Sequence, residues 1–272
     1  YDTYAQEHPG RNNLPVVTGK PLEMGGSLGR NEATGLGVFF AADRAVRLGI
    51  VDGLTTLEGA AVAVQGFGNV ASAAARSFQA AGARIVVVSD SQGGIYFEDG
   101  LDLDAVAAFK SEHGTVVGLP GTRSLGSGEI VTADCDVLVP AATSGQIHAG
   151  NAHEVKARLV VEGANGPVTA DADPLLAGRG IVLLPDILAN AGGVCVSYYE
   201  WVQNNENEQW EMEDVNRKMR RKMERAVDAV LARQRRLNAE PEAPFPADLR
   251  LAAIVTAVER IANITLKRGI WP

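Results

Sequence analysis

Short apolar segments alternate with helix-forming segments through the middle of the chain, and this alternation restricts the possible folds more than any other feature. Each apolar run is continuous, as in 84–89, which is typical of strands buried on both faces of a parallel sheet. Strands joined by helical crossovers form βαβ units, so the sequence predicts an α/β fold with a doubly wound parallel sheet. The expected strands are 60–65, 84–89, 136–140, 159–162 and 181–184, and the expected crossover helices are 69–81, 104–112, 151–157 and 170–178.

The two ends of the chain differ from this central pattern. Residues 1–30 are rich in proline and glycine and are expected to be irregular. From Gly192 onward the sequence favours helices without strands, so C-terminal helices should follow the sheet. The additional helices are expected at 31–49, 193–203, 211–236 and 247–267, and the one linker-like stretch is marked by Pro241, Pro244 and Pro246.

The acidic balance of the chain argues against an anionic partner. Over 272 residues the formal net charge is −8, and the basic run at 217–225 is expected to be a solvated helix face. No run reaches the ~18 apolar residues of a membrane span, and no leader segment is recognisable, so we expect a cytoplasmic protein that binds neither nucleic acid nor membrane. Cys135 and Cys195 form no disulfide framework, and the four scattered histidines have no metal-ligand spacing, so no metal site is expected.

A G-x-G-x-x-A pattern lies between a predicted strand and a predicted helix, at residues 66–71. Gly66 would permit the tight turn, Gly68 would let the backbone approach a diphosphate, and Ala71 would let the helix pack closely on the strand. The free N–H groups at the start of the helix would add a partial positive charge. In this strand-turn-helix context the pattern predicts a dinucleotide-binding site on a Rossmann-like sheet.

Asp90 ends the next predicted strand, 24 residues after Gly66. A carboxylate there can accept hydrogen bonds from the adenosine ribose of a dinucleotide. Asp90 could instead only open the turn over 90–94, for which its neighbours are well suited. A methyltransferase that binds S-adenosylmethionine is a further alternative for the fold, but it needs no diphosphate contact, and the tight glycine pattern argues against it.

Three further segments place glycine, asparagine and small residues where predicted strands end. They are 140–143, 162–167 and 185–193. Because ligands in an open α/β sheet lie outside the carboxyl ends of the strands, these segments are expected to line one crevice. Each segment taken alone is also compatible with ordinary turns.

Several longer motifs resemble those of the glutamate dehydrogenases, and together they cover essentially the whole chain. Leucine and phenylalanine dehydrogenases share the cofactor motif but diverge in the last of these segments. The resemblance implies oxidative deamination of L-glutamate to 2-oxoglutarate and ammonia, or the reverse, with NAD or NADP as cofactor. The motifs are KPLEMGGSLGRNEATG at 20–35, QGFGNV at 65–70, EGANGP at 162–167, LANAGGV at 188–194 and SYYEWVQN at 197–204.

The resemblance also implies roles for individual residues. Thr34 and Asn190 would hold the nicotinamide carboxamide and its ribose. Val194 would contact the carbon chain of the substrate, and the Ser197 hydroxyl would donate to its side-chain carboxylate. The diphosphate and adenosine side would be held by Gly66, Phe67, Gly68, Asn69, Val70 and Asp90, and the cofactor would be flanked by Ala141, Ala142 and Asn165.

By the same resemblance, residues 1–30 would be the remnant of a linker from a missing N-terminal substrate domain. Residues 31–191 would be the dinucleotide-binding domain, and residues 192–272 would be helices that pack on both domains. The family's catalytic lysine and aspartate lie in K-G-G and P-x-D-x-x-T segments, and neither segment is recognisable here; Lys20 stands in a different context.

We therefore expect this chain to bind cofactor without turning over glutamate, and the full-length protein to form a homo-hexamer. A non-catalytic dinucleotide-binding regulatory module is the alternative function. The choice between NAD and NADP leans slightly to NAD, because Asp90 would repel a 2′-phosphate, although Ser91 could donate to one.

Overall fold

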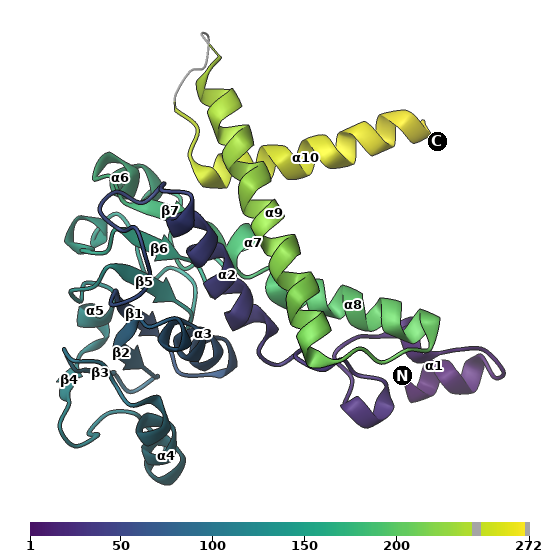
Figure 1. The fold of residues 1–272 in the computed structure, drawn as a ribbon, viewed down its shortest axis with the longest axis horizontal. Helices are drawn as coiled ribbons and strands as arrows, with labels where there is room; N and C mark the ends of the chain where they lie inside the picture. The colour runs from purple at the N-terminus through teal and green to yellow at the C-terminus, as the bar shows by residue number, and fades with distance from the viewer. Residues whose placement is uncertain (241–245, 270–272) are drawn as a thin grey trace.

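The centre of the molecule is a mixed seven-stranded sheet with the order β4-β3-β2-β1-β5-β6-β7 (Figure 1). The computed structural model describes residues 1–240 and 246–269. From β1 the chain moves outward to β4 and then returns to the other side of β1 at β5. Strands β2, β1, β5, β6 and β7 run parallel, which confirms the expected doubly wound α/β fold. The strands are β1 (Ala61–Gln65), β2 (Arg84–Ser89), β3 (Gly94–Tyr96), β4 (Arg123–Leu125), β5 (Val137–Pro140), β6 (Leu159–Val161) and β7 (Val182–Leu184).

Helices cover both faces of the sheet, so the central strands are apolar throughout. Successive strand residues point to opposite faces: on β1, Val62 and Val64 join one core and Ala63 joins the other. The first core is closed by α2 and α3 with the C-terminal helices, and the second by α5 and α6. The helices before these C-terminal ones are α1 (Asp2–Glu7), α2 (Ala33–Arg47), α3 (Asn69–Ala80), α4 (Leu103–His113), α5 (Ser127–Ile130), α6 (Asp173–Gly178) and α7 (Asp186–Ala189).

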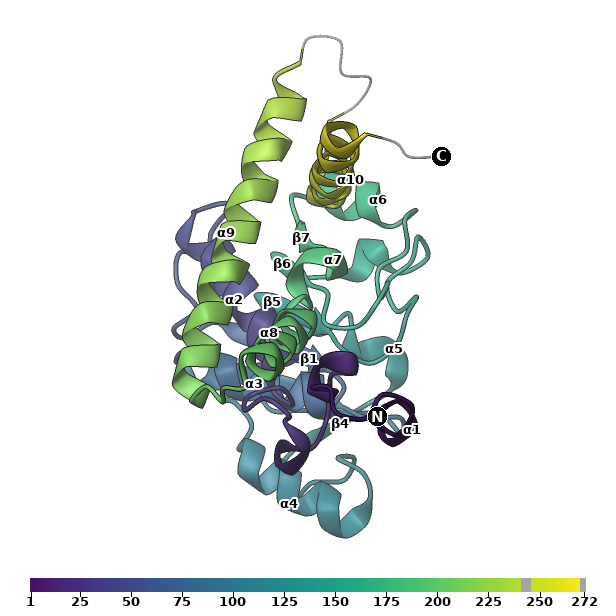
Figure 2. The same cartoon turned by 90° about the vertical axis from the view of Figure 1, so that its right-hand side faces the viewer.

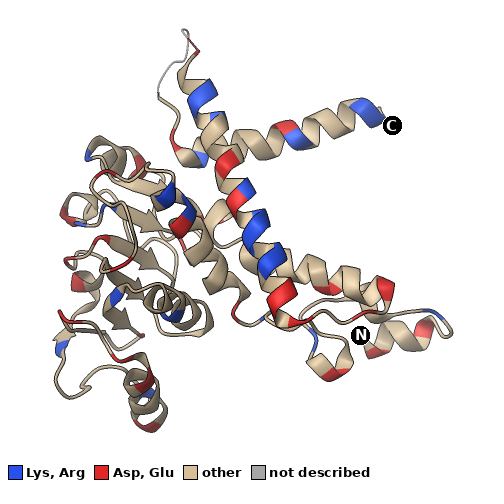
Figure 3. Cartoon of the chain, in the orientation of Figure 1, with Lys and Arg blue, Asp and Glu red and all other residues tan. Residues whose placement is uncertain are grey.

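Three longer helices follow the sheet and extend to one side of it (Figures 1 and 2). They are α8 (Gly192–Glu206), α9 (Met212–Asn238) and α10 (Leu249–Arg268). Helix α9 buries an apolar stripe that includes Met219 and Met223, and its charged residues lie on the remaining faces (Figure 3). The buried residues of α10 are Leu249, Ala252 and Ala253, so this helix joins the body of the molecule through its first turns.

The N-terminal segment lies along α8 and is less irregular than expected. It contains α1 and two short 3-10 helices, η1 (Leu14–Val16) and η2 (Leu22–Met24). The Asn204 side chain donates to the Gly25 carbonyl at 2.7 Å, and the Lys20 ammonium pairs with the Glu200 carboxylate at 2.7 Å. Both members of this ion pair are nearly fully buried, so the segment is held on α8 by polar contacts rather than by an apolar core.

The helix expected over 151–157 is wrong. A single 3-10 turn, η3 (Ala152–Glu154), is followed by extended backbone in which Val155 and Ala157 are buried and the residue between them is exposed. The Asn151 side chain accepts from the His148 amide and donates to the Gln146 carbonyl, and such local bonds favour a turn over a helix.

The antiparallel strands β3 and β4, which complete one side of the sheet, were not predicted. Each has only three residues, which is too short for a recognisable alternation. The remaining predicted strands and long helices are present with small shifts of their ends; the helix expected from residue 170 begins at Asp173, directly before Pro174. Of the linker prolines, Pro241 and Pro244 lie outside the described residues.

Candidate functional site

A crevice of about 600 Å³ opens at the carboxyl ends of β1, β5 and β6, beside the start of α8. Its lining comes from segments that lie far apart in the sequence, as expected for the switch point of a doubly wound sheet. Eight of the thirteen predicted site residues line it: Thr34, Val70, Ala141, Ala142, Asn165, Asn190, Val194 and Ser197. The other five lie outside this lining: Gly66, Phe67 and Gly68 form the turn after β1, Asn69 begins α3, and Asp90 directly follows β2.

The turn after β1 needs its first glycine for backbone reasons. Gly66 has φ 107°, and a Cβ there would lie 3.2 Å from the Ala141 carbonyl oxygen. Its N–H donates to the Ser89 hydroxyl at 2.8 Å, which ties the turn to the end of β2. These two contacts hold the turn next to Ala141, which lines the crevice, and next to Ser89, which directly precedes Asp90.

The second glycine has a different environment. Gly68 precedes α3 in extended backbone, and a Cβ built there would meet no atom within 4 Å. No side chain caps the start of α3, so its first N–H groups have no side-chain acceptor. Open space above an uncapped helix start is the arrangement that lets backbone N–H groups approach a phosphate.

Asp90 forms the turn that was the alternative interpretation of this residue. One carboxylate oxygen accepts from the Gln92 N–H at 2.9 Å, and the other accepts from the Val116 N–H at 2.7 Å. Burial raises the pKa of Asp90, but the two backbone hydrogen bonds, a hydrogen bond with the Thr115 side chain and the Lys110 charge together hold the pKa below its ordinary value. Each oxygen keeps a second lone pair, so the turn and a ribose contact are compatible.

Lys110 adds a positive charge to the same region, and sequence reasoning missed it. Its ammonium donates to the Phe67 carbonyl at 3.0 Å and lies 5.8 Å from the centre of the Phe67 ring. Lys110 belongs to α4, 43 residues away in sequence, on a helix with no motif of its own. No sequence signal pointed to this contact.

At the other end of the crevice, two asparagines are paired. The Asn190 side-chain amide donates to the Asn165 side-chain oxygen at 2.7 Å, and this contact joins the loop after β6 to the residue after α7. The sequence placed both residues in the crevice but gave no reason to pair them.

The start of α8 packs against α2 so closely that only glycine fits. A Cβ on Gly192 would lie 2.1 Å from the Ala33 carbonyl oxygen, and a Cβ on Gly193 would lie 2.3 Å from the Thr34 hydroxyl. The Gly192-Gly193 pair thus has a packing cause. This close approach brings Thr34 and the first turn of α8 into one wall of the crevice.

The same wall carries a polar pair and an exposed apolar side chain. The Arg30 guanidinium donates to the Ser197 hydroxyl at 3.0 Å, and that hydroxyl donates to the Gly193 carbonyl at 3.1 Å. Val194 is 69% exposed, which is unusual for valine within a helix of the core. Arg30 was not among the predicted site residues; its position inside the GGSLGRNEATG motif was the available signal.

Lys20 does not belong to the crevice lining. Its ammonium donates to Glu200 at 2.7 Å and to the Val17 carbonyl at 2.6 Å, and its side chain is 4% exposed. These contacts occupy Lys20, so it is not available to polarise a carbonyl in the crevice.

Other chemistry has little support in the described residues. There, no group of three histidine, cysteine, aspartate or glutamate residues is placed to hold a metal ion. Both cysteines, Cys135 and Cys195, are buried and unbonded, and burial raises the pKa of the Cys135 thiol to about 12. Within residues 1–240 and 246–269, no helix is long and apolar enough to cross a membrane.

Comparison with protein families gives a match over nearly the full chain. The model described as Glutamate/Leucine/Phenylalanine/Valine dehydrogenase matches residues 25–269. The chain belongs to this family. The match includes the crevice residues from Arg30 to Ser197, so these residues occupy the part of the fold that the family shares.

Three curated relatives from this dehydrogenase family are similar over most or all of the chain. A glutamate dehydrogenase from Thermotoga maritima is 46% identical over 272 residues, which is 100% of this chain and 62% of the relative. An NAD-specific glutamate dehydrogenase from Staphylococcus aureus (strain COL) is 43% identical, covering 95% of this chain and 59% of the relative. An NADP-specific glutamate dehydrogenase A1 from Halobacterium salinarum is 47% identical, covering 94% and 59%. The chain thus spans about three fifths of the length of these relatives.

A solved structure from the same family agrees with the fold. The hetero-hexameric glutamate dehydrogenase from Thermus thermophilus, in its Leu-bound form, superimposes with a TM-score of 0.88 at 36% identity. The superposition covers 100% of this chain and 61% of the Thermus chain.

Proposed function

We propose that this chain forms the dinucleotide-binding part of a glutamate dehydrogenase. Such an enzyme oxidatively deaminates L-glutamate to 2-oxoglutarate and ammonia with NAD or NADP, and catalyses the reverse reaction. The observation that carries the proposal is the crevice, where eight predicted residues from distant segments line one cavity. In this proposal residues 31–191 bind the dinucleotide, residues 192–272 complete the substrate side, and residues 1–30 connect to a further substrate domain.

The residues present fit a dinucleotide. The open space above Gly68 and the uncapped start of α3 suit a diphosphate, and Lys110 adds a positive charge beside that turn. A crevice of about 600 Å³ is within the usual range for small-molecule sites. When bound, the nicotinamide would accept or supply a hydride. The chain's own residues would hold the two halves of the cofactor at opposite ends of the crevice.

Arg30 and Ser197 support a carboxylate-bearing substrate. The guanidinium and the hydroxyl lie within 3.0 Å of each other on the crevice wall, and both groups can donate to a carboxylate oxygen. The exposed Val194 side chain lies one turn before Ser197 and can contact an aliphatic chain. Together they fit a substrate with a charged end and a short apolar stem, such as glutamate or 2-oxoglutarate.

Proton transfer is the step for which this chain lacks recognisable residues. In the family that the motifs resemble, oxidative deamination uses a lysine of lowered pKa and a carboxylate that moves protons. Lys20 is held by Glu200, and it does not line the crevice. We therefore expect this chain by itself to bind cofactor without oxidising glutamate.

The same observation favours a second function, a non-catalytic dinucleotide-binding regulatory module. Both functions need the crevice, but a regulatory module needs no proton-transferring lysine. A full-length gene product that carries the K-G-G and P-x-D-x-x-T segments and oxidises glutamate would support the first function. A full-length product that binds NADH and lacks both segments would support the second.

The decisive experiment is fluorescence titration of the purified chain with NADH and NADPH, with glutamate oxidation assayed in parallel. We expect NADH to bind somewhat more tightly than NADPH, and no turnover. If neither nucleotide binds while S-adenosylmethionine does, the proposal is wrong. Glutamate oxidation by this chain would show that the proton-transferring groups are within it.

The substrate side can be tested separately by adding 2-oxoglutarate to the NADH complex. Arg30→Gln and Ser197→Ala should weaken 2-oxoglutarate binding while leaving NADH binding unchanged. The proposed assembly, a homo-hexamer of the full-length protein, is testable by native mass measurement; the Thermus thermophilus relative is described as a hetero-hexamer.

A further inference from the structure

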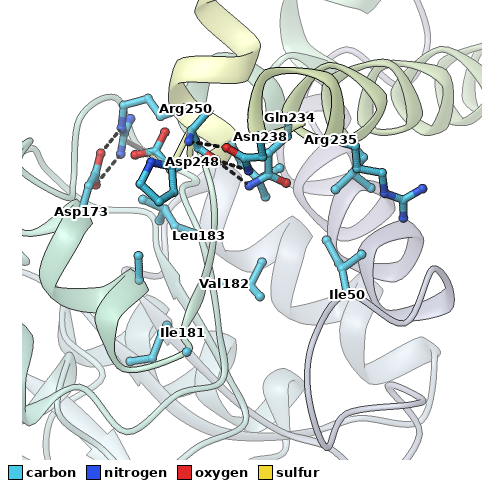
Figure 4. A pocket seen from close by; sticks show the side chains of 16 residues that line it. Ile50, Asp173, Ile181, Val182, Leu183, Gln234, Arg235, Asn238, Asp248 and Arg250 are labelled. Atoms are coloured by element: carbon cyan, nitrogen blue, oxygen red, sulfur yellow. Dashed lines mark hydrogen bonds and ion pairs between the residues drawn. The ribbon is translucent and has the colours of Figure 1, made fainter. Parts of the chain in front are cut away.

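A cluster of buried charges lies at the junction of α10 with the sheet. Glu162 directly follows β6 and is fully buried, and Arg250 in the first turn of α10 donates to both of its oxygens at 2.9 Å. The same guanidinium donates through Nε to Asp173 at 2.6 Å, and both side chains line a cavity of about 420 Å³ that Figure 4 shows from close by. All three guanidinium nitrogens therefore face carboxylates.

The carboxylates of this cluster also hold the backbone of the crevice loops. Glu162 accepts from the Asp186 N–H at 2.6 Å through one oxygen and from the Val168 N–H at 3.1 Å through the other. Asp186 in turn accepts from the Gly166 N–H at 2.8 Å and lies 3.6 Å from the Arg250 guanidinium. The loop over 163–168 and the start of α7 are thus fixed to one carboxylate pair.

These two segments carry the paired asparagines of the crevice. Asn165 is within the loop over 163–168, and Asn190 directly follows α7. Their side chains are joined by the 2.7 Å hydrogen bond, and both line the crevice. Hydrogen bonds therefore lead from Arg250 through Glu162 to Asp186, whose carbonyl accepts from the Asn190 N–H at 3.0 Å and whose carboxylate holds Gly166, the residue after Asn165.

The charge of Glu162 depends on Arg250. Burial raises the pKa of Glu162, and the hydrogen bonds from Arg250 oppose this increase without cancelling it. Without the guanidinium, Glu162 would be a buried carboxylate with no cationic partner. The free-energy cost of burying an unpaired carboxylate exceeds the stabilisation that the ion pair provides. Glu162 would therefore take up a proton, or the loops around it would rearrange.

We propose that Arg250 is a positioning residue for the nicotinamide end of the cofactor. This inference rests on the proposed function, in which Asn165 and Asn190 contact the nicotinamide side. The first turn of α10 sets the position of both asparagines and hence the affinity for that half of the dinucleotide. The adenosine end is built on β1 and β2, and in the described residues its hydrogen bonds do not include this cluster.

The test compares two ligands on the same chain: NADH, which reaches both ends of the crevice, and ADP, which reaches only the adenosine end. In Arg250→Met, NADH affinity should fall about tenfold, the equivalent of one lost hydrogen bond. ADP affinity should stay within about twofold of the unsubstituted chain. Arg250→Lys keeps the positive charge but loses the forked guanidinium that binds both Glu162 oxygens. Its NADH affinity should therefore lie between that of the unsubstituted chain and that of Arg250→Met.

Two further variants separate positioning from general destabilisation. Adding Glu162→Gln to Arg250→Met removes the unpaired buried charge and should recover part of the NADH affinity. The matched control is Arg233→Met, which removes the ion pair that Arg233 of α9 makes with Glu259 of α10. It should leave both ligands unchanged.

Equal loss of NADH and ADP affinity in Arg250→Met would overturn the inference, and so would unchanged NADH affinity. If Arg250→Met does not fold, Arg250→Lys is read against the same two ligands, and an equal loss of both has the same meaning. Failure of the proposed function is recognised separately, because the unsubstituted chain would then bind neither NADH nor NADPH.

Discussion

The two ends of the proposed cofactor site are built in different ways. The proposed adenosine end is formed by residues 65–90, one stretch of chain in which strand, turn, helix and strand follow directly, and its hydrogen bonds join backbone N–H groups to the Ser89 and Asp90 side chains. The nicotinamide end is assembled from segments near residues 30, 141, 165 and 190. The loops that carry Asn165 and Asn190 are held by the buried charges of the Arg250 cluster, and the N-terminal segment is held on α8 by the buried Lys20–Glu200 pair.

This difference predicts different sensitivities. A site made of local backbone geometry depends on a few residues with unusual φ and ψ angles. Substitution of a glycine is expected to have the largest effect there. A site made of distant segments depends on the contacts that hold them, and buried ion pairs are strongly sensitive to the loss of one partner. The following predictions compare matched changes at the two ends.

The largest expected effect is the contrast between two lysines, Lys20 in the N-terminal segment held on α8 and Lys110 beside the turn after β1. Lys20→Met leaves Glu200 buried without its cation and should lower the free energy of unfolding by about 3 kcal/mol. Lys110→Met removes a partly buried ammonium whose acceptor is a backbone carbonyl, and should cost less than about 1 kcal/mol. Urea denaturation of both variants measures the two values.

The pair also tests whether charge is what holds the N-terminal segment on α8. The double variant Lys20→Met with Glu200→Gln should recover part of the stability lost in Lys20→Met. Equal losses in the two lysine variants would contradict the proposed difference between the ends.

The next largest effect concerns the two glycines of the turn. Gly66→Ala forces a side chain onto a positive φ and against the Ala141 carbonyl, so it should cost about 1–3 kcal/mol of stability. Gly68→Ala meets open space at an ordinary φ, so its stability should change by less than about 1 kcal/mol. NADH should nevertheless bind Gly68→Ala more weakly, because the methyl group would occupy the space proposed for the diphosphate. A fully stable Gly66→Ala variant would show that the turn tolerates a side chain.

The same difference explains how much of the fold could be predicted from the sequence. Strands β1 and β2 and helix α3 follow from continuous apolar runs and a glycine pattern, and their ends were predicted to within about two residues. Strands β3 and β4 have three residues each and form by pairing with β2 and with each other. They are determined by tertiary pairing, so no local sequence pattern predicted them. The helix expected at 151–157 failed because Asn151 uses its side chain for local hydrogen bonds.

For the site, the turn after β1 and Asp90 could be proposed as the adenosine and diphosphate side from residue chemistry alone, because a glycine turn, a helix start and an acidic residue have a characteristic spacing. The nicotinamide end could be named only through family resemblance. Its members Thr34, Asn165 and Asn190 have no common spacing, and their proximity depends on how α2 and α8 cross. Arg30, Lys110 and Arg250 act through contacts across the fold, and no local pattern distinguishes them from surface cations.

A smaller effect is expected on the choice of cofactor, which should be set at the adenosine end alone. Asp90→Asn removes a negative charge near the proposed position of the 2′-phosphate while keeping an acceptor for the Gln92 N–H. NADPH affinity should rise about tenfold relative to NADH affinity. The substitution removes the Coulomb repulsion between the carboxylate and the 2′-phosphate, which has about this effect in a solvated site. Asp104→Asn, on exposed α4, is the matched control and should leave the ratio unchanged. A similar change in both variants would mean that Asp90 does not face the cofactor.

The smallest effect is a pH dependence of opposite sign at the two ends. Hydrogen bonds from backbone N–H groups hold the pKa of Asp90 below its ordinary value despite burial, so its stabilisation is present above about pH 4 and is lost as the pH falls through the lowered pKa. Burial holds the pKa of Glu162 above its ordinary value despite Arg250, so its contribution is present at low pH and is lost as the pH rises through the raised pKa.

Urea denaturation between about pH 3 and pH 7 separates these contributions when each variant is compared with the unsubstituted chain. The stability advantage of the unsubstituted chain over Asp90→Asn should shrink toward acid pH, because the unfolded chain binds the proton more readily than the folded one. Its advantage over Glu162→Gln should shrink toward neutral pH, because the folded chain holds that proton longer. Slopes of the same sign would mean that Arg250 cancels the effect of burial on the pKa of Glu162. The stability contribution of Glu162 would then fall toward acid pH, as that of Asp90 does.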